Sequence, residues 1–211
     1  MMTPVEGDRV VLVHGLWMNR LAMLPMAWRL AHCGFRVTRH GYRSVSRGLR
    51  ENARDLAATC AKCCGRLHLV GHSLGGLVIM AMMQDHPEIP VHRVVLIGSP
   101  YAGSAAARSI GRFAWSDRAI GHTMRDWLRL PRPPVPPGLE LGVIAGVGAI
   151  GLGRLLVDLP PPNDGVVMVG ETLVPGATDS IVLQTSHSVM LVSAAVARAT
   201  CTFLKHGKFQ R

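Results

Sequence analysis

The sequence places one serine in a setting suited to nucleophilic chemistry. The segment Gly71-His72-Ser73-Leu74-Gly75-Gly76 matches the pattern Gly-x-Ser-x-Gly. It stands between a predicted strand and a predicted helix, which is the context that the pattern requires. Glycines near Ser73 remove Cβ atoms that would clash on so sharp a turn, and the helix start supplies free N–H groups. The pattern predicts Ser73 as a nucleophile supported by Gly71 and Gly75; the alternative is a Gly-rich turn that fits by coincidence.

A serine that attacks a carbonyl also needs two backbone N–H groups directed at the oxygen that becomes negatively charged. Leu74, the residue after the serine, is the first predicted donor of this oxyanion hole. The second is expected in His14-Gly15-Leu16, at the end of the first predicted strand. We assign it to Leu16, because Gly15 lets the backbone approach closely. The His14 side chain is expected to shape this loop through hydrogen bonds.

The acid and base that serve such a serine follow it in the chain, first Asp or Glu and then His. His187 is the predicted base, because it lies between the last predicted strand and the final helix; a simple helix-cap role is the alternative. The candidates for the acid lie between the strand expected at 139–147 and His187. They are Asp158, Asp164, Glu171 and Asp179. Asp164 stands on an Asp-Gly turn from which a carboxylate can orient a histidine. Such turns are common, so position alone leaves Asp179 as its main rival.

The elements that must position these residues alternate between short apolar runs and amphipathic stretches. This alternation predicts a parallel sheet covered by helices on both faces, in a single domain over 1–211. Strands are expected at 9–14, 35–40, 66–71, 91–97, 139–147 and 179–184, and helices at 19–33, 47–62, 74–84 and 189–205.

The region from about 102 to 138 interrupts the alternation. It holds two short amphipathic pieces and a Pro-rich run at 131–137, which cannot be a central strand. We predict a cap-like or lid-like insertion whose apolar side chains either line an acyl-binding groove or only pack on the core. These side chains are Ile110, Phe113, Trp115, Ile120, Met124, Trp127 and Leu128.

Composition excludes several classes of protein. Of the 211 residues, 48% are hydrophobic and 17% charged, which excludes a disordered chain. The 23 Lys and Arg against 13 Asp and Glu give a net charge of +10. Nucleic-acid binding is not expected, because no recognised binding signature accompanies the charge. The charge predicts either contact with anionic substrates or an anionic membrane surface, or simply a solvated basic surface.

The N-terminus and the cysteines both suggest the cytoplasm. The first residues lack the basic and apolar regions of a signal peptide. Five irregularly spaced cysteines do not form a disulfide framework. Cys60, Cys63 and Cys64 are expected to be thiols at a helix end, because a single Cys-x-x-Cys pair is a weak zinc signal. No metal and no cofactor are predicted.

Four stretches together resemble the α/β-hydrolase superfamily, and within it the small bacterial lipases and esterases: His14-Gly15, 71–76, 163–167 and Ser186-His187. In such lipases a similar Asn-Asp-Gly segment supplies the acid a little over twenty residues before the histidine, so the resemblance favours Asp164. Gly98-Ser-Pro-Tyr-Ala-Gly-Ser104 is also similar to a stretch that these lipases carry.

The resemblance implies a minimal α/β-hydrolase fold, with about six mostly parallel strands, helices on both faces and a short cap. It implies a serine esterase or lipase that forms an acyl-enzyme on a small ester, without a cofactor; a thioesterase or acyltransferase with the same triad is the alternative. Several such lipases bind calcium through an Asp two residues after the histidine. Val189 stands there in this chain, so no such calcium site is expected.

Overall fold

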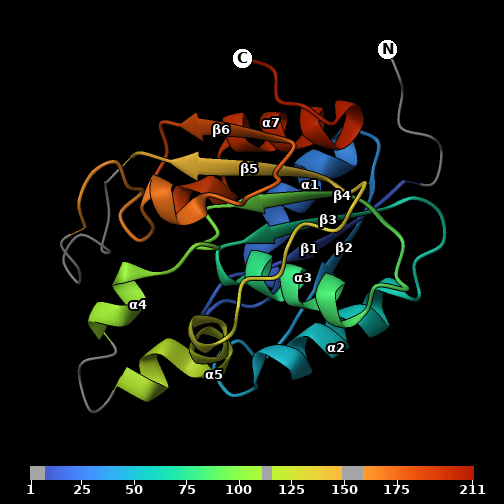
Figure 1. Ribbon diagram of the computed structural model, residues 1–211. Helices are drawn as coiled ribbons and strands as arrows, with labels where there is room; N and C mark the ends of the chain where they lie inside the picture. Colours follow the sequence, from blue (N-terminus) through green and yellow to red (C-terminus); the bar gives the residue numbers. More distant parts are fainter. Residues whose placement is uncertain (1–7, 111–115, 149–158) are drawn as a thin grey trace.

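The computed structural model describes residues 8–110, 116–148 and 159–211 and contains one six-stranded sheet (Figure 1). Its strand order is β2-β1-β3-β4-β5-β6, and every neighbouring pair is parallel. The predicted fold class is therefore confirmed. The strands are β1 Arg9–Val13, β2 Arg36–His40, β3 Leu67–His72, β4 Val91–Ile97, β5 Glu140–Gly146 and β6 Asp179–Leu183.

The strand order creates the crevice in which a site can form. The chain runs from β1 outward to the edge strand β2 and then returns to β3 on the other side of β1. The connections that follow β1 and β3 therefore leave the sheet side by side at its carboxyl edge, and open parallel sheets bind ligands at such a switch point. The interior strand β3 is buried along its whole length, which explains its largely apolar sequence.

Helices cover both faces of the sheet (Figure 1). On β1, Val11 and Val13 belong to the apolar core shared with α2, α3 and α5. Val10 and Leu12 point the other way, into the core shared with α1 and α7. The helices are η1 Arg20–Met23, α1 Leu24–His32, α2 Leu49–Cys60, α3 Leu74–Asp85, α4 Ala105–Ile110, α5 Ser116–Arg129, η2 Val169–Thr172, η3 Val189–Leu191 and α7 Ala194–His206.

Two predicted helices are divided in the structure. The helix expected at 19–33 is a 3-10 turn followed by α1. The helix expected at 189–205 is η3 followed by α7, because Ser193 has an extended backbone and its side chain accepts a hydrogen bond from the Val196 N–H. A serine in this geometry is an N-cap, so a new helix starts there.

From the sequence no disulfide framework is expected, but two of the five cysteines are bonded to each other. Cys33, at the end of α1, forms a disulfide with Cys201 on α7, across a sequence separation of 168 residues. Cys60, Cys63 and Cys64 are free. Cysteine usage therefore no longer supports a reducing compartment. Within the described ranges, no helix is both long and apolar enough to cross a membrane.

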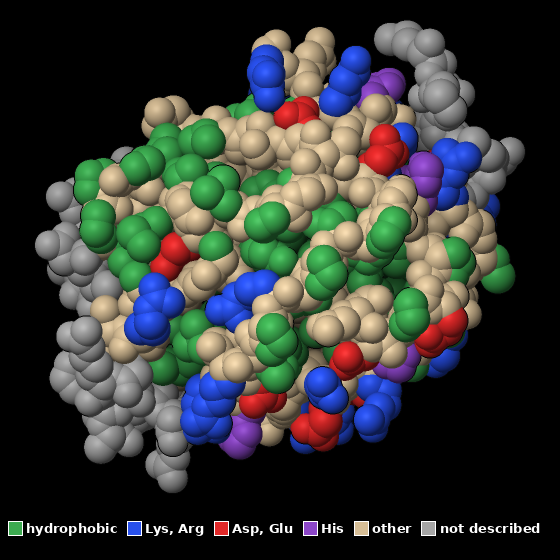
Figure 2. Space-filling model, viewed as in Figure 1, with side chains coloured by type: hydrophobic (Ala, Val, Ile, Leu, Met, Phe, Trp, Pro, Cys, Tyr) green, Lys and Arg blue, Asp and Glu red, His purple; other side chains and the backbone are tan. Residues whose placement is uncertain are grey.

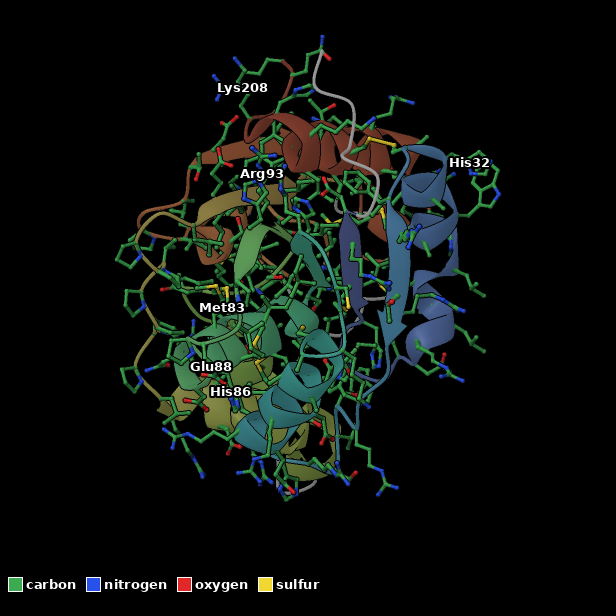
Figure 3. The ribbon with its side chains drawn as sticks, turned by 90° about the vertical axis from the view of Figure 1, so that its right-hand side faces the viewer. His32, Met83, His86, Glu88, Arg93 and Lys208 are labelled. Carbon is green, nitrogen blue, oxygen red and sulfur yellow. A yellow bond between two sulfur atoms is a disulfide. The ribbon has the colours of Figure 1, made fainter. Side chains whose placement is uncertain are left out.

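Basic and acidic side chains share the face of the molecule that Figure 2 shows. Figure 2 shows Lys and Arg side chains scattered over one face, with Asp and Glu between many of them. At the amino ends of the strands, which Figure 3 faces, Arg93 pairs with Glu140 at 2.6 Å and His86 with Glu88 at 3.1 Å. Contact with an anionic membrane stays a prediction.

Candidate active site

Ser73 occupies a strained turn between β3 and α3. Its φ of 53° and ψ of −124° lie in a region of backbone conformation that residues other than glycine seldom adopt. Backbone strain of this kind clusters at functional sites. The turn is possible because its glycines carry no Cβ. A Cβ on Gly71 would lie 2.5 Å from the backbone of Gly76, and one on Gly75 would overlap the carbonyl oxygen of Val13 in β1. The close approach of α3 to the sheet explains why the motif needs glycine at both positions.

The loop after β1 lies beside this turn. His14 is buried, its Nδ1 lies 2.9 Å from the Gly15 carbonyl oxygen, and its Nε2 accepts from the Tyr42 backbone N–H at 3.4 Å. Nδ1 therefore carries the proton. The Tyr42 ring stacks on His14 at 4.5 Å, and its hydroxyl donates to the His14 carbonyl oxygen. These contacts fix the backbone that leads to Leu16, which lines the same cavity as Ser73.

Asp164 and His187 form a buried pair. His187 Nδ1 lies 2.7 Å from Asp164 Oδ2, and the His187 backbone N–H donates to the Asp164 carbonyl oxygen at 2.9 Å. The other carboxylate oxygen, Oδ1, accepts from the backbone N–H groups of Val166 and Val167 at 2.9 and 2.7 Å. The turn that follows the aspartate thus holds one oxygen, and the second oxygen is left to orient the histidine.

The other candidate acids lie elsewhere. Asp179 begins β6, at the amino edge of the sheet, and accepts from the Phe209 backbone N–H at 2.8 Å. Glu171 is buried and accepts from the backbone N–H groups of Met168 and Ala105, so it ties the start of α4 to the loop after Asp164. Asp158 lies outside the described residues.

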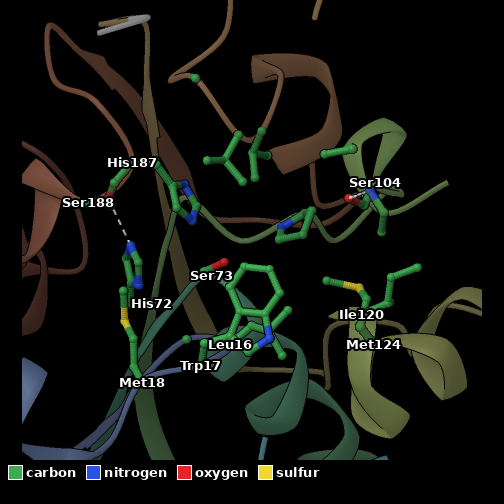
Figure 4. A pocket seen from close by; sticks show the side chains of 17 residues that line it. Leu16, Trp17, Met18, His72, Ser73, Ser104, Ile120, Met124, His187 and Ser188 are labelled. Carbon is green, nitrogen blue, oxygen red and sulfur yellow. Dashed lines mark hydrogen bonds between the residues drawn. The ribbon is translucent and has the colours of Figure 1, made fainter. Parts of the chain in front are cut away.

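Ser73 and His187 face a common cavity of about 230 Å³ (Figure 4). Its walls are mostly apolar, and no Lys, Arg, Asp or Glu is among the described residues that line it. The sequence analysis missed Trp17, whose indole lies over the serine side of the cavity and is 61% exposed. The lining residues are Gly15, Leu16, Trp17, Met18, His72, Ser73, Pro100, Ser104, Ala106, Ala107, Ile120, Met124, Gly165, Val166, Val167, His187 and Ser188.

The insertion contributes part of this cavity. Ile120 and Met124 of α5 line it, whereas Trp127 is buried in the core and Leu128 packs against that core. Ile120 and Met124 also belong to this core, so they line the cavity and pack on the core at once. That the cavity binds an acyl group stays a prediction. The side chains of Ile110, Phe113 and Trp115 lie outside the described ones. Among the described residues, no group of three or more His, Cys, Asp or Glu side chains is suited to a metal ion.

A parallel sheet with a serine on a strand-to-helix turn, followed by an acid and a histidine on later loops, defines the α/β-hydrolase class. The sequence model of the alpha/beta hydrolase family matches residues 10–174. The chain belongs to this family.

Known relatives agree with this class. RutD of Variovorax paradoxus, whose name describes a carbamate hydrolase, is 32% identical over 94 residues, which span 40% of this chain and 35% of RutD. The mature Bacillus licheniformis lipase BlEst2 has a similar structure, with a TM-score of 0.78, 19% identity and coverage of 96% of this chain and 93% of that chain. The metagenomic carboxyl esterase MGS0156 is also similar in structure, with a TM-score of 0.70 and 19% sequence identity. The match covers 88% of this chain and 66% of that chain. The structural likenesses show the fold, and the family with its esterase and lipase neighbours supports a hydrolase.

Proposed function

We propose that the protein is a serine hydrolase that cleaves carboxylic esters through an acyl-enzyme, with Ser73, His187 and Asp164 as its triad. The observation that carries the proposal is the buried Asp164–His187 pair, 2.7 Å apart, beside an apolar cavity that Ser73 also lines. Sequence order, turn strain at Ser73 and family membership support it further.

The proposed reaction follows from the proton positions. Asp164 Oδ2 accepts the Nδ1 proton of His187, which leaves His187 Nε2 free to take the proton of Ser73 as its Oγ attacks the carbonyl. The backbone N–H groups of Leu16 and Leu74 stabilise the oxyanion. The alcohol leaves with the proton from His187, and a water activated by the same histidine then releases the acid.

The cavity favours an uncharged ester with an apolar acyl group. Its described lining lacks Lys, Arg, Asp and Glu, and burying an unpaired charge there would be costly. We therefore place the acyl chain between Leu16, Trp17 and the α5 side chains Ile120 and Met124. The same triad would serve thioesters and acyl transfer, so a substrate series must include both.

The test is activity on short p-nitrophenyl esters with S73A as the central variant. S73A should lose hydrolysis and fluorophosphonate labelling while keeping its fold by circular dichroism. Retained turnover in S73A would contradict the proposal. A chain-length series of esters, thioesters and carbamates on the wild-type protein then defines the acyl group and the leaving group.

A further inference from the structure

His72 is a buried side chain to which the triad gives no chemical role. It lies directly before Ser73 and is fully buried. Its Nε2 lies 3.0 Å from the backbone carbonyl oxygen of His187, and Figure 4 shows this bond beneath the loop that carries His187. Since a carbonyl oxygen can only accept, Nε2 carries the proton and donates it to the bond.

The opposite edge of the His72 ring faces the loop after β1. A Cβ on Gly15 would lie 3.1 Å from His72 Nδ1, and this nitrogen has no hydrogen-bond partner within the described part of the chain. Burial, with a smaller contribution from the neighbouring His187, lowers the pKa of His72 to about 3. The ring is therefore neutral, and its single N–H serves the His187 carbonyl.

Two other hydrogen bonds of His187 join it to Asp164, the proposed acid. Its backbone N–H and its Nδ1 both contact Asp164, at 2.9 and 2.7 Å. Asp164 comes from the connection between β5 and β6, so these two bonds fix His187 relative to that connection. The bond from His72 differs, because its donor is covalently adjacent to Ser73. It links the turn of the serine directly to the backbone of the histidine.

We propose that His72 is a positioning residue that sets the distance between His187 and Ser73. Its Nε2–H donates to the His187 carbonyl oxygen, and its ring keeps the loop that carries His187 apart from Gly15. The rings of His72 and His187 are 4.8 Å apart and tilted by 47°, so the contact also limits rotation of the loop. This inference rests on the proposed function, in which His187 takes the proton of Ser73.

The test compares H72F, which keeps an aromatic ring without a donor, with H72Q, which restores an N–H near the Nε2 position. The measurements are kcat and KM on a p-nitrophenyl ester and the rate at which a fluorophosphonate labels Ser73. A displaced base should lower kcat and the labelling rate of H72F by up to about 100-fold, with little change in KM. H72Q should recover most of this loss.

The outcomes separate the two proposals. A folded H72F that is labelled at the wild-type rate overturns the positioning role, and so does a slow H72F that H72Q fails to restore at equal Tm. If H72F does not fold, H72M supplies the variant without a donor and is judged by the same criteria. Absence of labelling in the wild-type protein, or turnover by S73A, would instead overturn the proposed function itself.

Discussion

Replacement of Asp164 by Asn should disable the base while keeping the loop intact. Asp164 Oδ1 accepts two backbone N–H groups, from Val166 and Val167. In D164N the amide oxygen must take this place, because the amide nitrogen there would face two donors. The amide NH2 then points at His187 Nδ1, where Oδ2 stood 2.7 Å away. Nδ1 must accept, so the ring proton moves to Nε2.

A histidine with its proton on Nε2 cannot take the proton of Ser73. The wrong tautomer in a serine triad lowers kcat by about 10⁴-fold, the value known for the matching change in the chymotrypsin-type triad. We expect a loss of about 10³- to 10⁴-fold in kcat/KM, or about 4–5.5 kcal/mol of transition-state stabilisation. The loop keeps both of its backbone bonds, so Tm should fall by only a few degrees.

The assay is kcat/KM for a p-nitrophenyl ester, measured together with thermal unfolding. D179N is the matched control, because Asp179 lies at the opposite edge of the sheet and bonds the Phe209 N–H. It should keep wild-type activity. A folded D164N within about tenfold of wild type would refute the tautomer argument, since one decade corresponds to only about 1.4 kcal/mol.

Three further perturbations test the fold. Loss of the Cys33–Cys201 disulfide, which joins residues 168 apart, should cost about 2–4 kcal/mol in urea unfolding; an unchanged midpoint on reduction would contradict this. G75A should lower Tm and activity because its Cβ overlaps β1, whereas G170A, where a Cβ meets nothing within 4 Å, should be neutral. Burial lowers the pKa of His68 to about 4, whereas in the unfolded chain its pKa is about 6.5. The free energy of unfolding should therefore be highest above pH 6.5 and fall as the pH drops toward 4, by up to about 1.4 kcal/mol per pH unit. A urea midpoint that stays constant from pH 7 to 5 would argue against it.

The interior strands were predictable because each centres on a local apolar run with clear boundaries. The predicted strand at 91–97 matches β4, which lies between Pro90 and Gly98. Helix boundaries were harder, since Ser193 looks like an interior position until its backbone is seen to be extended. Apolar periodicity indicates that a helix exists, whereas its first residue depends on one hydrogen bond.

The contacts around the site depend on tertiary structure that local patterns do not encode. The Gly-x-Ser-x-Gly turn is local, so Ser73 could be singled out directly as the candidate nucleophile. The choice of Asp164 as the candidate acid required the family resemblance, because four carboxylates lie between the strand expected at 139–147 and His187, and loop packing decides which of them reaches the histidine. The bond from His72 to the His187 carbonyl spans 115 residues and leaves no periodic signal.

The net charge of +10 does not by itself locate the cations relative to the candidate site. Net charge is a sum over the chain, and it carries no information about where each cation lies. Arg132 stacks over the Trp127 ring at 5.0 Å and donates to the Leu130 carbonyl oxygen, so even a cation of the insertion has a structural contact. The cavity, by contrast, has no Lys or Arg among its described lining residues. Exposed charges are screened within about 10 Å at moderate salt, so in the proposed mechanism the buried Asp164–His187 pair, rather than the surface charge, determines the reaction at Ser73.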